Sequence, residues 1–205
     1  MGWYGERILP RLVDRACGIR PLQPLRARVC AGLHGRVVEV GFGSGLNVVH
    51  YPDAVTSVAA IEPADRAWEL ATERLAGSPV PIERAGVDGG RLPLADASCD
   101  TALSTWTLCT VPDVEAALHE LRRVLKPGGT LHFVEHGLAP DADVRRRQRR
   151  LEPLQRRFAG GCHLTRDVVD LVTTAGFHVH DVDRFYEPTS PRPVGALSLG
   201  VAVSP

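Results

Sequence analysis

Val37-Val38-Glu39-Val40-Gly41-Phe42-Gly43-Ser44-Gly45 (residues 37–45) decides the fold, because an apolar strand pattern runs directly into three glycines at alternate positions. Glycine has no Cβ, so these positions permit a tight turn and let a ligand approach the backbone. In open α/β sheets, a loop of this kind at the carboxyl end of a central strand binds a nucleotide-sized ligand. We therefore expect Gly41, Phe42, Gly43 and Gly45 to contribute to a cofactor site.

Short apolar runs alternate with helical patterns along the chain. This alternation is typical of an α/β sheet built from parallel strands with helices on both faces. The expected strands are 36–40, 55–61, 80–83, 100–104, 130–135, 177–182 and 194–203.

Two helices are predicted between the later strands. Apolar residues recur at helical spacing over 114–125, and Lys126-Pro127-Gly128-Gly129 is expected to end that helix in a turn. A second helix is expected to be capped by Thr165 and to end at Gly176.

The chain is predicted to have two parts, a short N-terminal helical cap (1–35) and the sheet domain (36–205). Within 6–33, two short helical patterns are separated by Pro21 and Pro24. They are too small for a domain of their own, so we expect them to pack over the sheet domain.

Composition narrows the function classes. The 205 residues are 44% hydrophobic and carry no net charge, which favours one ordinary domain and argues against a nucleic-acid or other large polyanionic partner. The five cysteines form no CxxC pair and are odd in number, so we expect no metal site and no disulfide framework. A reducing, cytoplasmic location fits them, and no apolar run is long enough to cross a bilayer.

The segment 144–158 carries seven arginines, and its apolar positions 144, 151, 154 and 158 share one helical face. A solvated amphipathic helix is the favoured interpretation. Docking on a membrane surface and contact with nucleic acid are the alternatives.

Charge and glycine spacing separate two ligand classes. A dinucleotide site has a third glycine where this chain has Leu46, and the negative charge of Glu39 disfavours a pyrophosphate. Glu39 suits instead the amino group or sulfonium of S-adenosylmethionine. Glu62 ends the second strand, where a carboxylate can accept both hydroxyls of a ribose.

The chain at this point resembles the class I S-adenosylmethionine-dependent methyltransferases, of the small type that includes ubiquinone/menaquinone-biosynthesis enzymes. Residues 37–45 look like the first motif of that family, Glu62-Pro63 like its ribose-binding acid, and 123–129 like its turn before the fifth strand. The resemblance implies a doubly wound, Rossmann-like, seven-stranded sheet with an antiparallel last strand. It also implies that Asp88 and the Gly89 backbone hold the adenine.

A narrower resemblance is to the methyltransferase-like 7 group, whose animal members are membrane-associated and methylate alkyl thiols. It is carried by three segments, 107–111 (TLCTV), 133–136 (FVEH) and 161–166 (GCHLTR). The long apolar anchor of those animal proteins is not found at residues 1–35, so we do not expect membrane residence.

The implied chemistry is in-line displacement at the sulfonium methyl, for which the protein supplies alignment and exclusion of water. Thr105 is expected to line the cavity, and the Trp106 ring to stabilise the sulfonium. His136 and His163 are the candidate bases for an acceptor thiol or hydroxyl.

The acceptor is expected to be small and lipophilic, under a roof formed by Trp3-Tyr4, the helix 8–16 and Phe185-Tyr186. Two other functions remain open. One is a dinucleotide-binding oxidoreductase, and the other is a cofactor-binding module without catalytic activity.

Overall fold

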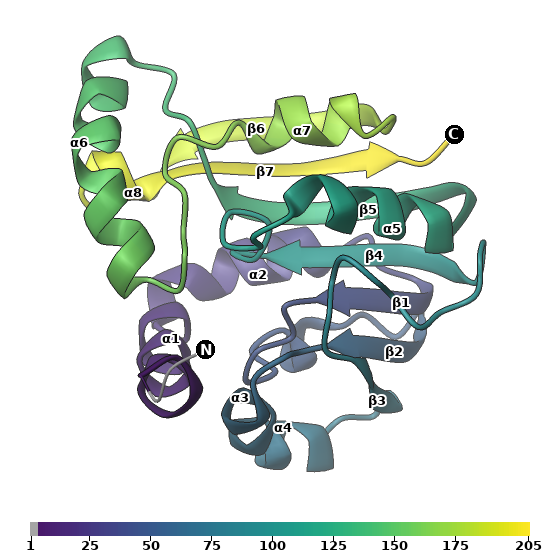
Figure 1. Cartoon of the computed structure of the whole chain (residues 1–205). Coiled ribbons are helices and arrows are strands. Elements are labelled where there is room, and N and C mark those ends of the chain that lie inside the picture. The colour runs from purple at the N-terminus through teal and green to yellow at the C-terminus, as the bar shows by residue number, and fades with distance from the viewer. Residues whose placement is uncertain (1–3) are drawn as a thin grey trace.

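A computed structural model describes residues 4–205 and shows a seven-stranded sheet with helices on both faces (Figure 1). Along the sheet the strands run in the order β3-β2-β1-β4-β5-β7-β6. β7 is antiparallel to both of its neighbours, and the other six strands are parallel to one another. The doubly wound arrangement with an antiparallel last strand is therefore confirmed. The strands are β1 (Gly35–Val40), β2 (Val55–Ile61), β3 (Ile82–Gly86), β4 (Cys99–Thr105), β5 (Leu125–His136), β6 (His178–Tyr186) and β7 (Ala196–Val203).

The helices alternate with these strands, as the sequence predicts. The short turns η1 (Tyr4–Ile8, a π-helix), η2 (Arg20–Leu22) and η3 (Val48–His50, both 3₁₀) accompany them. The α-helices are α1 (Leu9–Cys17), α2 (Gln23–Cys30), α3 (Asp65–Leu70), α4 (Thr72–Ala76), α5 (Val114–Val124), α6 (Ala142–Phe158), α7 (Val168–Thr174) and α8 (Arg192–Gly195). None of the helices in residues 4–205 has the length and apolar character that crossing a bilayer requires.

Two hydrophobic cores lie on opposite faces of the sheet, because neighbouring residues of a strand point to opposite sides. Val38 of β1 packs with the apolar stripe of α5 and with α7, while Val37 packs with α2 on the other face. The stripe predicted on 114–125 is buried in the structure from Val114 to Val124. α2, from the N-terminal segment, thus covers a face of the sheet.

Several local predictions were wrong. Thr165 does not cap α7; the Asp167 side chain accepts the backbone N–H of Asp170, while Thr165 bonds to Glu152. The segment 126–129 is not a turn between elements but a bulge inside β5, where the register with β4 jumps. The third strand begins two residues later than predicted, at Ile82, and so does the last, at Ala196, because residues 194 and 195 belong to α8.

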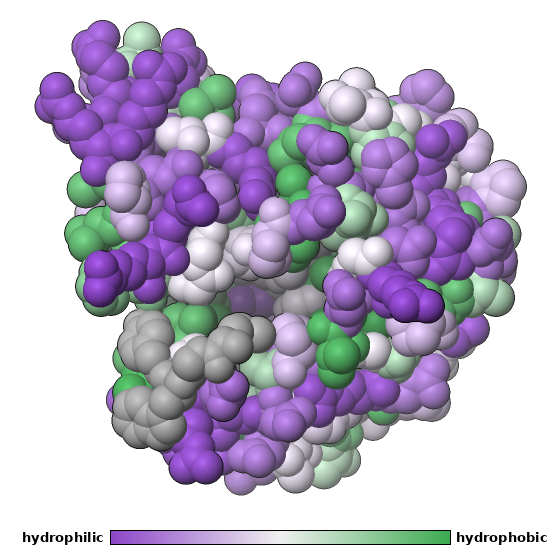
Figure 2. Space-filling model, viewed as in Figure 1, coloured by the Kyte–Doolittle hydropathy of each residue, from purple (hydrophilic) through white to green (hydrophobic). Residues whose placement is uncertain are grey.

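The arginine-rich segment forms α6, but its predicted apolar face is only partly covered. Val144 is buried, whereas the side chains of Leu151, Leu154 and Phe158 are 41%, 58% and 55% exposed. Strongly hydrophilic residues cover the upper end of this helix in Figure 2. α6 therefore packs on the domain mainly through its first turns.

The carboxyl ends of β1, β4 and β5 point to one side of the molecule, where α1 and α6 approach from different parts of the chain (Figure 1). α1 is tied to this edge through Asp14, which accepts a hydrogen bond from Ser44 Oγ at 2.6 Å and forms an ion pair with Arg74 at 3.0 Å. This edge brings together the residues described next.

Candidate active site

The loop after β1 adopts the conformation that its three glycines predict. Gly41, Gly43 and Gly45 have φ of +74°, +59° and +75°, in the left-handed region that favours glycine. A Cβ at Gly41 would lie 2.0 Å from Thr107 Oγ1, so Gly41 lets the loops after β1 and β4 pack together. Among the described residues, 4–205, a Cβ at Gly43 would meet nothing nearer than the Gly41 carbonyl at 3.8 Å. Gly43 therefore faces open space, as a backbone that receives a ligand would.

Phe42 lies between these glycines, and its buried ring packs beneath the loop, where a Cβ at Gly45 would lie 3.2 Å from it. Its ring is 3% exposed and packs against Trp68 of α3 with centroids 5.3 Å apart. Phe42 anchors the loop in the core between the sheet and α3, so any contact with a ligand would be through its backbone.

Glu62 links the end of β2 to the glycine loop. Its carboxylate accepts the backbone N–H of Gly43 at 2.7 Å and that of Ala64 at 2.8 Å. Burial raises the pKa of Glu62, although both hydrogen bonds oppose the shift. Each carboxylate oxygen keeps a free lone pair, since an ionised carboxylate has about four acceptor sites.

Beside Glu62, a cavity of about 490 Å³ opens between the N-terminal helices and α3. Pro63 lines it, as does Arg66, whose Nε is buried without a hydrogen-bond partner among residues 4–205. The other lining residues are Gly5, Glu6, Arg7, Arg11, Ala64, Asp65 and Glu69.

Glu39 is fully buried at the end of β1 and is the centre of a polar cluster. Its carboxylate accepts hydrogen bonds from the Tyr51 hydroxyl and from Asn47 Nδ2, the latter at 2.8 Å. Asn47 in turn accepts from Arg26 of α2 at 2.7 Å. Burial raises the pKa of Glu39 to about 7, because these hydrogen bonds and the Arg26 charge offset only part of the desolvation. The carboxylate thus has protein partners in addition to any cationic ligand.

Thr105 and Trp106 end β4 next to this cluster. Thr105 is buried, and its hydroxyl oxygen accepts from Asn47 Nδ2 at 3.0 Å. Trp106 has φ of +51°, an uncommon conformation for a bulky residue. The Arg26 guanidinium lies over the Trp106 ring, 4.8 Å from its centre, so this ring already makes a cation–π contact with the protein itself.

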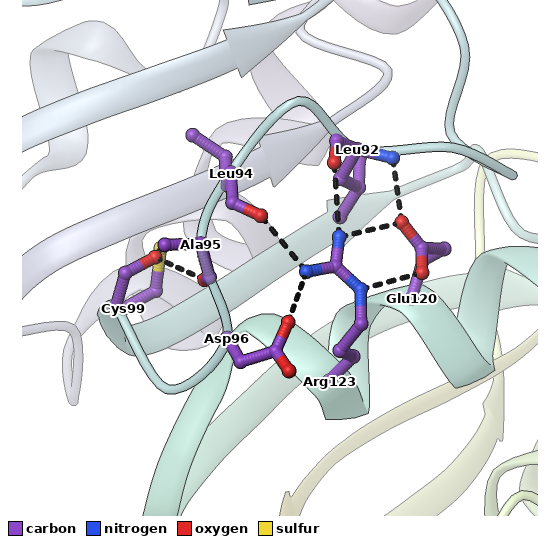
Figure 3. Close-up of polar contacts among 8 residues, drawn as sticks. Leu92, Leu94, Ala95, Asp96, Cys99, Glu120 and Arg123 are labelled. Atoms are coloured by element: carbon purple, nitrogen blue, oxygen red, sulfur yellow. Dashed lines mark hydrogen bonds and ion pairs between the residues drawn. The ribbon is translucent and has the colours of Figure 1, made fainter.

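The segment expected to hold the adenine lies in the loop before β4. The Asp88 carboxylate accepts from the Gly90 backbone, and a Cβ at Gly89 would lie 3.1 Å from Val40. Arg123 of α5 fixes the rest of this loop (Figure 3). It binds the carbonyls of Leu92 and Leu94 and the carboxylates of Asp96 and Glu120, at 2.6–2.9 Å.

We call the parts of the edge described so far the glycine-loop half (residues 39–47, 62–66 and 88–89). A second group, the cysteine half, lies at the ends of β4 and β5 and comprises 107–111, 135–136 and 161–166. Glu135 is fully buried there and accepts from Ser104 Oγ and from the backbone N–H groups of Thr107 and Cys109 at 2.7–3.1 Å. Burial raises its pKa.

His136 follows Glu135 and directs Nδ1 at two thiols. The distances from Nδ1 to Cys109 Sγ and Cys162 Sγ are 3.7 and 3.6 Å, and the two sulfurs are 3.7 Å apart. The contacts with Cys109 and His136 lower the pKa of the Cys162 thiol. His136 is therefore engaged with the two cysteines rather than free in a cavity.

His163 lies one residue beyond Cys162 and has different surroundings. Its Nδ1 is 3.4 Å from a carboxylate oxygen of Glu152, and its backbone N–H donates to the Cys109 carbonyl at 2.8 Å. Burial and the nearby Arg166 and Arg156 lower the pKa of His163. His163 also lines a second cavity of about 480 Å³, with Thr110, Pro112, Pro153, Arg156, Arg157 and Gly161.

The expected roof is partly described. Trp3 and the Tyr4 side chain lie outside what the structure describes. α1 does lie over the glycine loop, through Asp14. Phe185 packs in the core beside α2, and Tyr186 donates to Asp141 at 2.6 Å, so neither is shown facing a cavity.

Arg26, Asn47, Tyr51 and Glu135 were not expected from the sequence. Arg26 is one of 23 arginines and Tyr51 stands outside any motif. Of the four, Glu135 has a signal in the sequence, because it is a charged residue inside an apolar strand beside His136.

The sheet order and the ligand-facing loop after β1 together define the class I methyltransferase fold. A family model described as "Methyltransferase domain" matches residues 38–133. The thiol S-methyltransferase TMT1B of Rattus norvegicus is 34% identical over 171 residues, covering 82% of this chain and 70% of that protein. The chain belongs to the S-adenosylmethionine-dependent methyltransferases, in the family that includes this enzyme.

Two further similarities agree with this assignment. A demethylmenaquinone methyltransferase of Desulfitobacterium hafniense is 39% identical over 120 residues, covering 58% of this chain and 39% of that protein. The crystal structure of a SAM-dependent methyltransferase from Thermotoga maritima superposes with a TM-score of 0.67 at 25% identity, covering 95% of this chain and 94% of the other. The expected cofactor and enzyme class are thereby confirmed, and the oxidoreductase alternative is set aside.

The glycine-loop half fits S-adenosylmethionine on its own geometry. Gly43 leaves a backbone cradle that a Cβ would fill, and the Glu62 carboxylate lies against the same loop, where it accepts the Gly43 N–H. The unpartnered Arg66 Nε and the adjoining cavity supply polar space beside Glu62.

Proposed function

We propose that this enzyme methylates the sulfur of a small, lipophilic thiol. The observation that carries the proposal is the extent of the similarity to the thiol S-methyltransferase. An alignment that covers 82% of 205 residues leaves about 37 outside it, so any continuous span includes the whole cysteine half. The resemblance therefore extends beyond the cofactor loop to the part of the edge where an acceptor would bind.

We assign cofactor binding to the glycine-loop half. Gly41, Gly43 and Gly45 would receive the donor along the backbone, and Glu62 with Pro63 would hold the ribose. Asp88 and Gly89 would hold the adenine in a loop that Arg123 keeps in place. Glu39, Thr105 and Trp106 would lie next to the methionine portion, where the hydrogen-bonded Arg26–Asn47 pair keeps the Glu39 carboxylate in position.

The cofactor supplies an activated methyl group and its own leaving group. The protein needs to align the acceptor sulfur, exclude water and receive one proton. Aligning two bound reactants can lower the activation free energy by on the order of 7–11 kcal/mol. We assign the proton to His163, because its lowered pKa keeps the imidazole neutral near pH 7 and it lines the cavity beside the cysteine half. His136 would act through the thiols it contacts.

The N-terminal helix α1 would close the site, since Asp14 ties it to Ser44 of the glycine loop. A reducing, cytoplasmic environment is supported by the five free cysteines, two of which are in contact without a bond.

The test is a turnover assay that measures S-adenosylhomocysteine release with alkane thiols, quinols, phenols and amines as acceptors. The proposal predicts turnover with thiols well above the rest. Turnover with quinols and none with thiols would contradict it.

A further inference from the structure

Three segments far apart in the sequence each place one sulfur or nitrogen at a common point of the cysteine half. Cys109 comes from the loop after β4, His136 from the end of β5, and Cys162 from the loop after α6. Their three ligand atoms lie within 4.8 Å of one another. The same three segments, 107–111, 133–136 and 161–166, carry the narrower of the two resemblances found in the sequence.

The distances match the edges of a metal coordination tetrahedron. Zinc–sulfur and zinc–nitrogen bonds at tetrahedral angles separate two sulfurs by about 3.8 Å, and a sulfur from a nitrogen by about 3.5 Å. The observed separations are 3.7 Å between the sulfurs and 3.7 and 3.6 Å from each sulfur to His136 Nδ1. The three atoms therefore already have the spacing of three zinc ligands.

The backbone around these ligands is fixed by contacts outside the triad. Glu135 accepts the Cys109 N–H at 3.1 Å, and the His163 N–H donates to the Cys109 carbonyl at 2.8 Å. Gly161 has φ of +89° and lies so near that a Cβ would be 3.3 Å from the Thr110 carbonyl. Held this way, the ligands need little rearrangement to bind an ion, which favours metal affinity.

Charge balance supports the same assignment. Both cysteines are buried and His136 is half-buried, so two thiolates there would be costly without a cation. One divalent ion with two thiolates and a neutral imidazole is electrically neutral. Sulfur and imidazole ligands select zinc-like ions over magnesium or calcium.

We propose that Cys109, His136 and Cys162 bind a thiophilic divalent metal ion, zinc in particular, and that its fourth position takes the acceptor thiol. Three protein ligands with one open position are typical of catalytic rather than structural zinc. The role of the fourth position rests on the proposed thiol methylation; the metal site does not.

The corresponding reaction is balanced without a further reagent. With the ion bound, the acceptor S–H would give its proton to His163, the group that takes it in the proposed function, as the sulfur becomes the fourth ligand. The sulfur then attacks the methyl carbon and forms the new S–C bond, while the old S–C bond breaks and leaves its electron pair on the donor sulfur. The neutral thioether is a weaker ligand than a thiolate and leaves.

The decisive experiment measures metal on the full chain, separately from activity. Protein stripped with a chelator under reducing conditions is titrated with Zn²⁺ against a chromogenic indicator, and with Co²⁺ followed by absorption. We expect one ion per chain and the thiolate-to-cobalt charge-transfer bands of a tetrahedral site. Cys162→Ser and His136→Ala should each weaken zinc binding at least tenfold, whereas Cys99→Ala, which changes a buried cysteine elsewhere, should not.

S-adenosylhomocysteine affinity, measured by calorimetry on the same variants, should be unchanged and reports folding and the cofactor site. Failure of the wild-type protein to bind zinc, or equal binding by the ligand variants, would overturn the metal site. So would a Cys109–Cys162 disulfide as the stable form under cytosol-like reducing conditions. Zinc binding together with failure of thiol turnover would overturn only the assignment of the fourth position and the proposed acceptor.

Discussion

The two halves of the carboxyl edge present different chemical groups. The glycine-loop half relies on backbone, with three left-handed glycines and two carboxylates that accept main-chain or side-chain hydrogen bonds. The cysteine half relies on side chains, with two thiols and an imidazole brought together from three distant segments. One half is suited to a ligand of fixed shape, and the other to a reactive sulfur.

We expect this difference to separate binding of the methyl donor from methyl transfer. Changes in the glycine-loop half should reduce affinity for the donor, and changes in the cysteine half should reduce turnover while leaving that affinity intact. Three of the four variants below test this separation, and the fourth, Glu39→Gln, tests the electrostatics of the glycine-loop half.

Gly43→Val should have the largest effect. It places a side chain in the open space that we assign to the donor, and we expect S-adenosylhomocysteine affinity to fall by about 100-fold or more, roughly 2.7 kcal/mol. Isothermal calorimetry measures it. Gly128→Val is the matched control, since Gly128 also has a positive φ of +77° with no atom within 4 Å. Equal losses in both variants would mean that backbone strain, not the ligand, is responsible.

Glu62→Gln should weaken the same binding by about 1.5–3 kcal/mol, the range for hydrogen bonds to a charged group. The amide keeps the shape but loses the charge that the Gly43 N–H contacts and that the ribose hydroxyls would contact. Glu83→Gln, on the exposed edge strand β3, provides the comparison in calorimetry and should bind normally. An unchanged affinity for Glu62→Gln would place the ribose elsewhere.

Glu39→Gln should change how stability depends on pH. The pKa of Glu39 is raised to about 7 in the folded protein from 4.5, so the folded state binds the proton more tightly than the unfolded state. Stability from this group is present below pH 4.5 and is lost as pH rises through 7, by about 2 kcal/mol between pH 5 and 7.

Denaturant unfolding of wild type and Glu39→Gln at several pH values measures this loss. In Glu39→Gln, the free energy of unfolding should not show this fall between pH 5 and 7. In the exposed Glu83→Gln variant, the fall should remain as in wild type. Parallel pH profiles for wild type and Glu39→Gln would show that Glu39 titrates normally.

His163→Gln should have the smallest effect, and only on turnover. Because alkyl thiols are already partly ionised near neutral pH, we expect about a tenfold lower kcat with a thiol at pH 7. The deficit should shrink as pH rises towards the thiol pKa. The affinity for S-adenosylhomocysteine should not change, and a parallel loss of affinity would remove the distinction between the two halves.

The sequence predicts the glycine-loop half well because that half is local. Residues 37–45 form a continuous motif whose geometry follows from glycine itself, and Glu62 lies at the end of the next strand in register. The strand order follows from the resemblance, and the stripe on α5 follows from helical spacing. These features depend on short stretches of chain.

The cysteine half and the Arg26 cluster are not predictable in the same way. Cys109 and Cys162 are 53 residues apart and show no ligand spacing, so only the folded chain reveals that their sulfurs meet. Arg26 reaches Asn47 from α2, a contact that depends on how α2 packs on the sheet. The Thr165 cap was wrong because Glu152 of α6 binds Thr165, leaving Asp167 to start α7.

The most direct test of the central claim, that this edge transfers methyl to sulfur, is one product analysis by mass spectrometry. The enzyme is supplied with S-adenosylmethionine deuterated in its methyl group and with a linear alkane thiol or the alcohol of the same chain length. An enzyme that methylates sulfur should give a deuterated methyl thioether from the thiol and no methylated product from the alcohol. A methyl ether from the alcohol, or no thioether from a protein that binds S-adenosylhomocysteine, would contradict it.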